Sequence, residues 1–254
     1  MALTPAEFGS ASLAGRAALV VDVFRATTSV VAACAAGCRA VIPVPDADRA
    51  TAVARGLPPG QALLAGERGG EPIDGFDLGN SPLEFVPSRV RDRTIILTTT
   101  NGTRAMLAAA AAAVGAVAAL TNIEAAAQWA AEQGRDVTIL CAGEKGELSL
   151  EDTVCAGLLV DLLVAGRAAT QVSDGAMAAR RVGQHYGADL SRLREDSTWA
   201  RTLDRAGRAA DLAACIAVAS VDSVPLLAEG VVVPDPRAAG AGAPGRLDGR
   251  EARR

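Results

Sequence analysis

Charged and hydroxyl side chains gather at four places in the sequence, each directly after a short apolar run. The first run ends at Asp22, with Arg25 close behind it, and the second place reads "GERGGE" and contains Glu67. The stretches "TTTNGTR" (98–104) and "CAGEKGELSLED" (141–152) are the other two. Carboxylates are ligands for hard divalent cations, and arginine forks bind phosphate. The combination predicts a site for an anionic small molecule bridged to a divalent cation.

The segments between these places alternate between strand-like and helix-like patterns. Short apolar runs predict strands, whereas longer alanine-rich segments predict helices. The predicted strands cover 17–23, 39–44, 61–66, 93–98, 115–120 and 136–143, and the predicted helices cover 26–37, 47–56, 103–113, 122–134 and 149–166. This alternation predicts an α/β layer fold with a largely parallel (mixed) sheet.

The C-terminal third has a different pattern. Helices are predicted over 176–187 and 198–220, and "GVVVP" (230–234) is predicted as a single edge strand. No linker rich in Pro, Gly or Ser interrupts the chain, so we expect one domain over 1–237. The residues 238–254 are predicted to form a disordered tail, because their composition lacks large apolar side chains.

The predicted fold gives a reason for the four polar places. Ligands of open α/β sheets bind outside the carboxyl ends of the strands, where helices begin and their backbone N–H groups attract anions. We therefore expect the four places to meet at one edge of the sheet. Several of the polar segments also have purely structural interpretations. Asp22 is then an exposed helix cap, "TTTNGTR" a helix N-terminus, and "SLED" (149–152) a capping box. Asn80 in "FDLGNSP" is then part of a stiffened loop.

Composition limits the classes of function. Hydrophobic residues make up 50% of the chain but aromatic residues only 3%, so the core must be built from Ala, Val and Leu. The net charge is −4 and no basic stripe is present, which argues against a nucleic-acid partner. No stretch reads as a signal peptide or a membrane span, so we expect a cytoplasmic protein without membrane contact. The five cysteines lack metal-ligand spacing and are predicted to be free, buried thiols.

Motifs for nucleophilic catalysis or nucleotide binding are absent. The sequence contains neither a GxSxG elbow nor a phosphate-binding GxxxxGK[ST] loop, and "GERGGE" does not match GxGxxG. Cys141 has no arginine six residues later, which a cysteine-phosphatase loop requires. The only histidine, His185, falls in a late polar helix, and we interpret it as a surface or packing residue.

Five long segments resemble the 2-phosphosulfolactate phosphatase (ComB-like) family, in the same order. They are "VVDVFRATTSVVAACAAG", "LLAGERGGEPIDGFDLGNSPLEF", "LTTTNGTRAM", "CAGEKGELSLEDTVCAG" and "AADLAACIAVASVDSVP". The resemblance covers roughly residues 16 to 235. It implies a three-layer α/β/α fold and a Mg²⁺-dependent phosphatase that converts 2-phospho-3-sulfolactate to sulfolactate and phosphate, a step toward coenzyme M.

The resemblance also suggests roles for the polar residues. Asp22 is the first choice as metal ligand or base, and Asp22, Arg25 and Glu67 form the expected catalytic group. Asp22, Glu151 and Asp152 are the candidate metal ligands. The candidate substrate-binding residues are Arg25, Arg68, Asn80, Thr100, Asn101, Gly102 and Arg104. Attack by water and a covalent aspartyl-phosphate on Asp22 both remain open.

Two other classes of function fit less of the sequence. A non-catalytic binding protein for phosphorylated or sulfonated metabolites would have the same polar edge without turnover. A structural component of an oligomer would leave the polar edge unexplained. The true substrate is not fixed by the sequence, since the arginines would suit other phosphorylated small acids. A homodimer is likewise left open.

Overall fold

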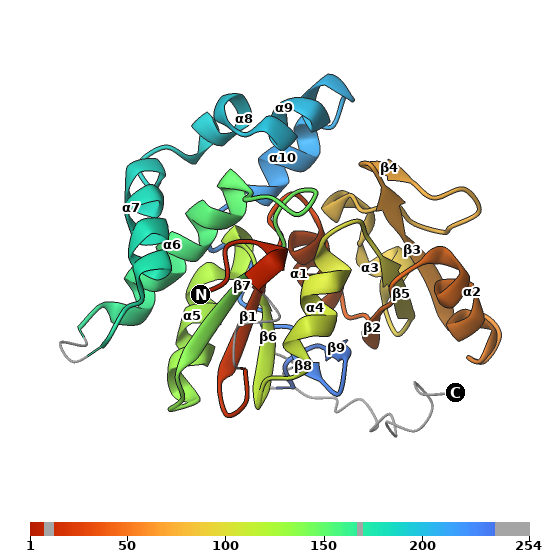
Figure 1. Ribbon diagram of the computed structural model, residues 1–254. Coiled ribbons are helices and arrows are strands. Elements are labelled where there is room, and N and C mark those ends of the chain that lie inside the picture. Colours follow the sequence, from red (N-terminus) through yellow and green to blue (C-terminus); the bar gives the residue numbers. More distant parts are fainter. Residues whose placement is uncertain (8–12, 167–169, 237–254) are drawn as a thin grey trace.

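The computed structural model describes residues 1–7, 13–166 and 170–236, and it has the predicted α/β architecture (Figure 1). The predicted tail, 238–254, lies outside the described residues. The strands are β1 (Ala17–Val21), β2 (Ala40–Pro43), β3 (Ala62–Arg68), β4 (Glu71–Pro72), β5 (Thr94–Thr98), β6 (Val114–Ala118), β7 (Val137–Cys141), β8 (Leu226–Ala228) and β9 (Val231–Val233). They form one mixed sheet in the order β4-β3-β5-β2-β9-β8-β6-β1-β7.

The helices follow the strands in the alternating order that the sequence predicts. They are α1 (Ala26–Ala35), α2 (Ala47–Arg55), α3 (Pro87–Val90), α4 (Gly102–Ala109), α5 (Ile123–Glu132), α6 (Leu150–Val164), α7 (Asp174–Tyr186), α8 (Leu193–Asp196), α9 (Thr198–Arg205) and α10 (Ala209–Cys215). Short 3₁₀ helices cover Pro5–Glu7, Pro82–Glu84, Leu120–Asn122 and Leu190–Arg192. None of the helices in the described parts of the chain is both long and apolar enough to cross a bilayer.

The sheet consists of two parallel groups joined by an antiparallel hairpin. Strands β3, β5 and β2 form one group, and β6, β1 and β7 form the other. The hairpin β8–β9 fills the seam, with β9 beside β2 and β8 beside β6. The prediction of a single edge strand at 230–234 was therefore wrong. A run of three valines between Gly230 and Pro234 suits a strand, but its pattern carries no information about which neighbours the strand pairs with.

Parallel-strand direction alone does not bring the four polar places together. Three antiparallel pairings lie between the two groups: β2 with β9, β9 with β8, and β8 with β6. Along the order of the sheet, the strands of one group therefore run opposite to the strands of the other. Strands in a sheet rotate by roughly 20–25° from each neighbour to the next, and this twist accumulates over nine strands. Residues at the ends of β1, β3, β5 and β7 line one pocket.

Helices cover both faces of the sheet, which gives the three layers. On β1, Ala18 and Val20 belong to the core beneath α1 and α4, whereas Leu19 and Val21 belong to the core beneath α5 and α6. A smaller cluster lies under α2, on the β2–β5 side. Small aliphatic side chains dominate all three clusters, as the low aromatic content predicts. All five residues of β1 are buried, so this strand holds the position of whatever follows it.

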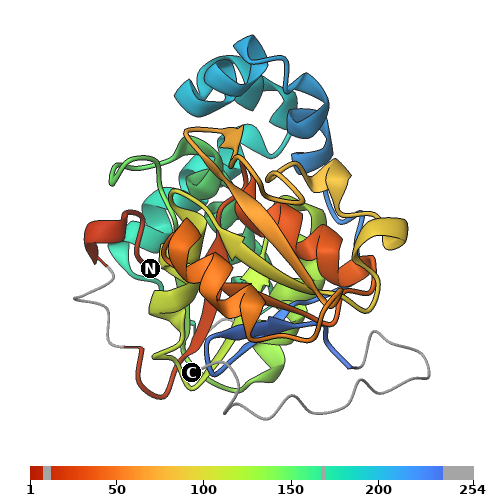
Figure 2. The same ribbon diagram turned by 90° about the vertical axis from the view of Figure 1, so that its right-hand side faces the viewer.

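The helical C-terminal third forms a cap over the end of the sheet. Helix α7 packs along α6, and α8 to α10 lie above the sheet in two views at right angles (Figure 1, Figure 2). Helix α10 contacts the 3₁₀ helix Pro82–Glu84, which follows the "FDLGNSP" loop. The cap therefore rests on the side of the sheet where the polar places lie.

Two glycines allow α6 and α7 to pack backbone against backbone. A Cβ added at Gly157 would collide with the carbonyl group of Ala179, and one added at Gly183 would lie 2.8 Å from the carbonyl carbon of Gly157. Gly175, in the first turn of α7, has no atom within 4 Å of an added Cβ. The close contact therefore depends on Gly157 and Gly183 and not on every glycine of the helix pair.

We expect Gly157→Ala to lower the free energy of unfolding by roughly 2 kcal/mol, because overpacking against a rigid backbone outweighs the better helix propensity of alanine. Gly175→Ala is the matched control and should be neutral or slightly stabilising. Urea denaturation followed by circular dichroism measures both. Equal effects of the two substitutions would show that the helices do not depend on this contact.

Candidate active site

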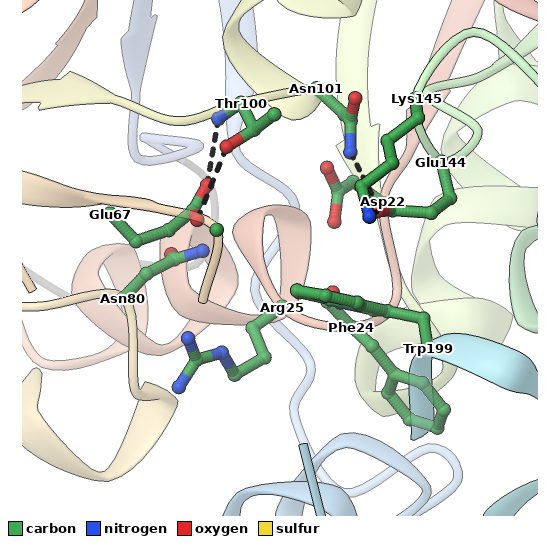
Figure 3. Close-up of a pocket in the computed structure, with 11 residues that line it drawn as sticks. Asp22, Phe24, Arg25, Glu67, Asn80, Thr100, Asn101, Glu144, Lys145 and Trp199 are labelled. Carbon is green, nitrogen blue, oxygen red and sulfur yellow. Dashed lines mark hydrogen bonds and ion pairs between the residues drawn. The ribbon is translucent and has the colours of Figure 1, made fainter. Parts of the chain in front are cut away.

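The four polar places meet in one pocket at the carboxyl ends of the strands, beneath the cap (Figure 3). This confirms the expected convergence. The pocket is lined by Asp22, Phe24, Arg25, Glu67, Gly69, Asn80, Thr100, Asn101, Glu144, Lys145 and Trp199. The residues expected from the sequence that do not line it are Arg68, Gly102, Arg104, Glu151 and Asp152.

Asp22 lies at the end of β1 with its carboxylate directed at the centre of the pocket (Figure 3). One oxygen, Oδ1, accepts a hydrogen bond from the backbone N–H of Ala26, at 3.1 Å, in the first turn of α1. The other, Oδ2, accepts none from the described residues. Burial raises the pKa of Asp22 to about 7, and the nearby carboxylates of Glu67, Glu151 and Glu144 add to this effect against the hydrogen bond from Ala26.

Gly102 lets the start of α4 approach Asp22. A Cβ at this position would lie 2.6 Å from Asp22 Oδ2 and 2.5 Å from the Cβ of Ala26. We expected this glycine to give a bound oxyanion close access to the backbone. In the structure the close neighbour is the Asp22 carboxylate itself, so the first turns of α1 and α4 both face the same side chain.

Glu67 joins the ends of β3 and β5. Its Oε2 accepts a hydrogen bond from the backbone N–H of Gly70 at 2.7 Å, and its Oε1 accepts one from the backbone N–H of Thr100, also at 2.7 Å. The Thr100 hydroxyl adds a third, at 3.2 Å (Figure 3). Both oxygens of this buried carboxylate are therefore already satisfied, and Glu67 fixes the shape of the pocket wall.

Asp152 lies behind Asp22 and is bonded on both oxygens. Its Oδ1 accepts from the backbone N–H of Val23 at 2.8 Å, and its Oδ2 accepts from that of Gly143 at 3.1 Å. These bonds tie the loop after β1 to the loop after β7. Burial raises the pKa of Asp152 well above its usual value, and repulsion from Asp22 adds to the rise. The neighbouring Glu151 is also buried, and burial raises its pKa although hydrogen bonds, including one from Ser197, oppose the rise.

The segment "SLED" is a helix cap as well as part of the acidic cluster. Ser149 Oγ accepts from the backbone N–H of Asp152 at 3.3 Å, as the capping-box interpretation predicts. In a capping box the Asp152 carboxylate would accept from the backbone N–H of Ser149. Here it accepts from the N–H groups of Val23 and Gly143 instead. Likewise in "TTTNGTR", Thr99 Oγ1 accepts from the N–H of Thr103 and caps α4, while the next two residues line the pocket.

The three candidate arginines are in different surroundings, and only Arg25 lines the pocket. Its guanidinium donates to Asp211 Oδ2 at 2.7 Å and to the carbonyl of Gly70 at 2.6 Å. Arg68 is bonded back onto its own strand and β5, through the carbonyl of Glu67 and the hydroxyl of Thr98. Arg104 is exposed on α4.

Two amides offer hydrogen bonds at the pocket. Asn101 Nδ2 donates to Glu144 Oε2 at 2.8 Å (Figure 3). Asn80 is buried, and its Oδ1 has no hydrogen-bond partner among the described residues. A buried amide oxygen without a partner is costly, so Asn80 is a group that a ligand would satisfy, with either end of the amide after a flip.

Several residues that line or support the pocket were not predicted from the sequence. Trp199 comes from α9, and its indole N–H donates to the carbonyl of Phe24 at 2.8 Å. Lys145 is the only lysine of the chain, and it stands at the pocket beside Glu144, with 3.8 Å between Nζ and Oε1. Its uniqueness within a recognised motif was a usable signal. For Trp199 and Asp211 no local pattern pointed to the pocket.

The structure provides no activated thiol or imidazole at this site. All five cysteines lie in the described part of the chain and are free and buried. Burial raises the pKa of Cys141 well above its usual value, with the Asp152 carboxylate adding to the rise, which disfavours a thiolate. His185 packs edge-on against Tyr186 in α7, consistent with a packing role. Carboxylates, amides, the Thr100 hydroxyl and the cations Arg25 and Lys145 are left as the polar groups of the pocket.

A divalent cation would have to be held with help from outside the protein. Among the described residues, no group of three or more His, Cys, Asp or Glu side chains is arranged to hold a metal ion. Mg²⁺ is commonly bound by one or two carboxylates together with water and substrate phosphate. Asp22, with one oxygen unbonded, fits that mode, whereas both oxygens of Asp152 already accept backbone N–H groups.

The fold and pocket thus define an α/β protein with a carboxylate-rich site suited to an anionic ligand. The family model described as 2-phosphosulpholactate phosphatase matches residues 2–230. The chain belongs to this family.

Curated relatives carry the same family name over nearly their full length. A protein of Symbiobacterium thermophilum named "Probable 2-phosphosulfolactate phosphatase" is 40% identical over 231 residues, covering 91% of this chain and 97% of that protein. Proteins with the same name from Caldanaerobacter subterraneus and Gloeobacter violaceus are 35% and 39% identical, covering 84% and 85% of this chain and 88% and 90% of their own lengths.

The raised pKa of Asp22 predicts a loss of stability with rising pH in protein kept metal-free with EDTA. The pKa of Asp22 is about 7 in the folded protein and 3.8 for an unperturbed aspartate, so the native state binds the proton more tightly than the unfolded state does. That contribution is complete below pH 4 and is lost as the pH rises through 7. The free energy of unfolding of Asp22→Asn, relative to that of the wild type, should therefore rise by on the order of 2 kcal/mol between pH 5 and pH 8. Chemical denaturation at several pH values measures the gain, and a pH-independent difference would contradict it.

The exposed position of Arg104 reverses the expectation from the sequence. If this arginine held phosphate through two parallel bonds, Arg104→Lys would lower kcat/KM about ten-fold. Because Arg104 lies outside the pocket, we expect kcat/KM to stay within about two-fold of the wild type. Steady-state kinetics of the purified variant decides between the two, and a ten-fold loss would place Arg104 at the substrate.

Proposed function

We propose that this chain is a Mg²⁺-dependent phosphatase that hydrolyses 2-phospho-3-sulfolactate, or a similar phosphorylated small acid, to sulfolactate and phosphate. The observation that carries the proposal is that the motif segments of a 2-phosphosulpholactate phosphatase family member build one pocket around Asp22. The pocket also contains the groups that such a reaction needs: a carboxylate with a free oxygen, hydrogen-bond donors, and a buried guanidinium.

The charge balance of the pocket supports a bound divalent cation. Asp22, Glu67 and Glu144 line the pocket, against the two cations Arg25 and Lys145. Arg25 is already paired with Asp211, so its charge is largely neutralised. A substrate with a phosphate and a sulfonate would meet an excess of negative charge. Bound Mg²⁺ would supply the missing positive charge and stabilise the phosphoryl oxygens as charge develops on them.

We propose Asp22 as the protein ligand of the metal. Glu151 and Asp152 were also candidates from the sequence, but neither lines the pocket. We give them a supporting role: Asp152 joins the loops after β1 and β7, and Glu151 adds to the rise in the pKa of Asp22. Burial and the nearby Glu67, Glu151 and Glu144 disfavour the charged form of Asp22, and a bound cation would favour it.

The remaining pocket residues orient the substrate. Asn80 and Asn101 present amides within reach of a bound oxyanion, whereas the Thr100 hydroxyl donates to Glu67 and holds the pocket wall in place. Arg25 keeps its Nε–H for a ligand, because the described residues accept only from its two Nη atoms. Lys145 adds a cation for a second anionic group. Trp199 limits access of bulk water from the cap side.

Asp22 takes part in the chemistry under either route for phosphoryl transfer. In one route its carboxylate orients the attacking water and accepts the proton of that water, while the P–O ester bond breaks and the departing alkoxide takes a proton from solvent. In the other, its oxygen attacks phosphorus while the P–O ester bond breaks and the alcohol leaves with a proton from solvent, and water then hydrolyses the aspartyl-phosphate to release phosphate. The proposal rests on Asp22 in both cases.

Other properties expected from the sequence remain proposals. A role on the route to coenzyme M follows only if phosphosulfolactate is the substrate. The free cysteines support a reducing compartment such as the cytoplasm. A homodimer stays a prediction.

Release of phosphate from 2-phosphosulfolactate tests the proposed function. We expect turnover with Mg²⁺, loss of turnover in EDTA, and recovery when Mg²⁺ is returned. Asp22→Asn should lower kcat at least 100-fold, equivalent to roughly 2.7 kcal/mol of transition-state stabilisation, with an unchanged or higher melting temperature. Asp48→Asn, at an exposed position in α2, is the matched control and should keep wild-type rates.

Two results would contradict the proposal. Full activity in rigorously metal-free protein would remove the metal from the mechanism. Tight binding of the substrate without any phosphate release would favour the non-catalytic binding protein instead.

A further inference from the structure

A buried ion pair connects the cap to the pocket. Arg25 Nη1 donates to Asp211 Oδ2 at 2.7 Å, and the two side chains are only 3% and 7% exposed. Asp211 belongs to α10, which lies far from Arg25 in the sequence. Its second oxygen, Oδ1, accepts a hydrogen bond from the Ser81 hydroxyl at 2.6 Å. Both oxygens of Asp211 are therefore used, one on Arg25 and one beside the "FDLGNSP" loop.

Two fixed acceptors determine the direction of the Arg25 guanidinium. Asp211 holds Nη1, and the carbonyl of Gly70 holds Nη2 at 2.6 Å. A planar guanidinium bonded at both Nη atoms has no rotational freedom left. It is directed away from the carboxylates of Asp22 and Glu144 (Figure 3).

Without these two acceptors, the Arg25 guanidinium would pair with a carboxylate of the pocket. Asp22, Glu67 and Glu144 line the same pocket, and an unpaired guanidinium would be drawn to them. A guanidinium bonded to Asp22 would occupy the oxygen that faces the pocket. Pairing Arg25 with Asp211 leaves Asp22 available while Arg25 still lines the pocket.

The cap has other attachments to the rest of the protein besides this pair. The indole of Trp199 donates to Phe24, and Arg208 contacts Glu71 at 3.1 Å. Buried ion pairs are on balance no more stabilising than apolar contacts of similar size. Stability alone therefore gives little reason for a buried aspartate at this position.

We propose that Asp211 is a positioning residue of the pocket, which holds Arg25 on the pocket wall and away from Asp22, so that its remaining N–H groups bind the anionic ligand. The proposal rests on the proposed function for the identity of that ligand as a phosphorylated acid. The cap thereby contributes to the site through a residue that does not itself line the pocket.

A double-mutant cycle tests the proposal, with Asp211→Asn, Arg25→Lys and the double variant. We expect Asp211→Asn to raise KM for 2-phosphosulfolactate about ten-fold and to change kcat less than three-fold. In the Arg25→Lys background the same substitution should change KM less than two-fold, because its effect acts through the guanidinium. A purely structural role predicts the opposite: less active protein, hence lower apparent kcat at unchanged KM.

Two further variants keep the test decisive. Glu71→Ala removes the exposed contact between the cap and β4 without touching Arg25, and it should leave KM within two-fold. Ser81→Ala removes only the second bond of Asp211 and should raise KM two- to three-fold, which covers the case in which Asp211→Asn does not fold.

Binding of inorganic phosphate in the presence of Mg²⁺, measured by calorimetry, separates this proposal from the proposed function. If the wild type releases no phosphate from the substrate, the proposed function fails, and the same cycle is read from Kd. The positioning role is supported if Asp211→Asn raises the Kd for phosphate ten-fold in the wild-type background and has no effect on Kd in the Arg25→Lys background. Additive effects, an unchanged Kd, or no phosphate binding by the wild type would overturn it.

Discussion

The burial of several carboxylates around Asp22 is the constraint on which the rest of the structure depends. Asp22, Glu67, Glu151 and Asp152 are all buried on the side of the sheet where the strands end. An uncompensated buried charge costs several kcal/mol, so each acid needs donors or a raised pKa. The chain uses both means, with backbone N–H groups on most of the acids and pKa values raised on three of them. Asp22 alone among those bonded acids keeps an oxygen toward the pocket, and it is the group that a cation would stabilise most.

The bonds that satisfy these acids also assemble the fold. Asp152 joins the loops after β1 and β7, and Glu67 joins the ends of β3 and β5. Each acid thus ties two strands of one parallel group, and the pocket forms where the two groups meet under the cap. Removing one carboxylate would leave backbone donors of two segments unpaired. Conservative amide substitutions are for this reason the informative ones, since they keep an acceptor and remove only the charge.

Much of this organisation could be predicted from local sequence, because strand-helix alternation and helix caps are local signals. Glu67 and Thr100 lie together because β3 and β5 are neighbouring parallel strands, whereas their approach to Asp22 depends on how the two parallel groups are arranged. The position of "GVVVP" could not be predicted, because lateral strand order is set by long-range packing. Arg104 shows a second limit: a polar motif identifies a segment, but the direction of each side chain depends on the helix that it starts. Asp211 and Trp199 lie in helices whose local pattern is that of ordinary packing, so only the folded chain shows that they reach the pocket.

The central claim is that burial, with the nearby carboxylates adding to it, disfavours the charged form of Asp22 in metal-free protein, and that a bound cation would favour it. The most direct measurement is the pKa of the Asp22 carboxyl group, obtained by following the ¹³C chemical shift of its carboxyl carbon against pH. The signal is assigned by its absence in Asp22→Asn, and the titration is recorded with and without Mg²⁺. The account predicts a pKa of about 7 in metal-free protein and a marked fall when Mg²⁺ is added. An ordinary aspartate pKa near 4 without metal, or a raised pKa that does not respond to Mg²⁺, would contradict it.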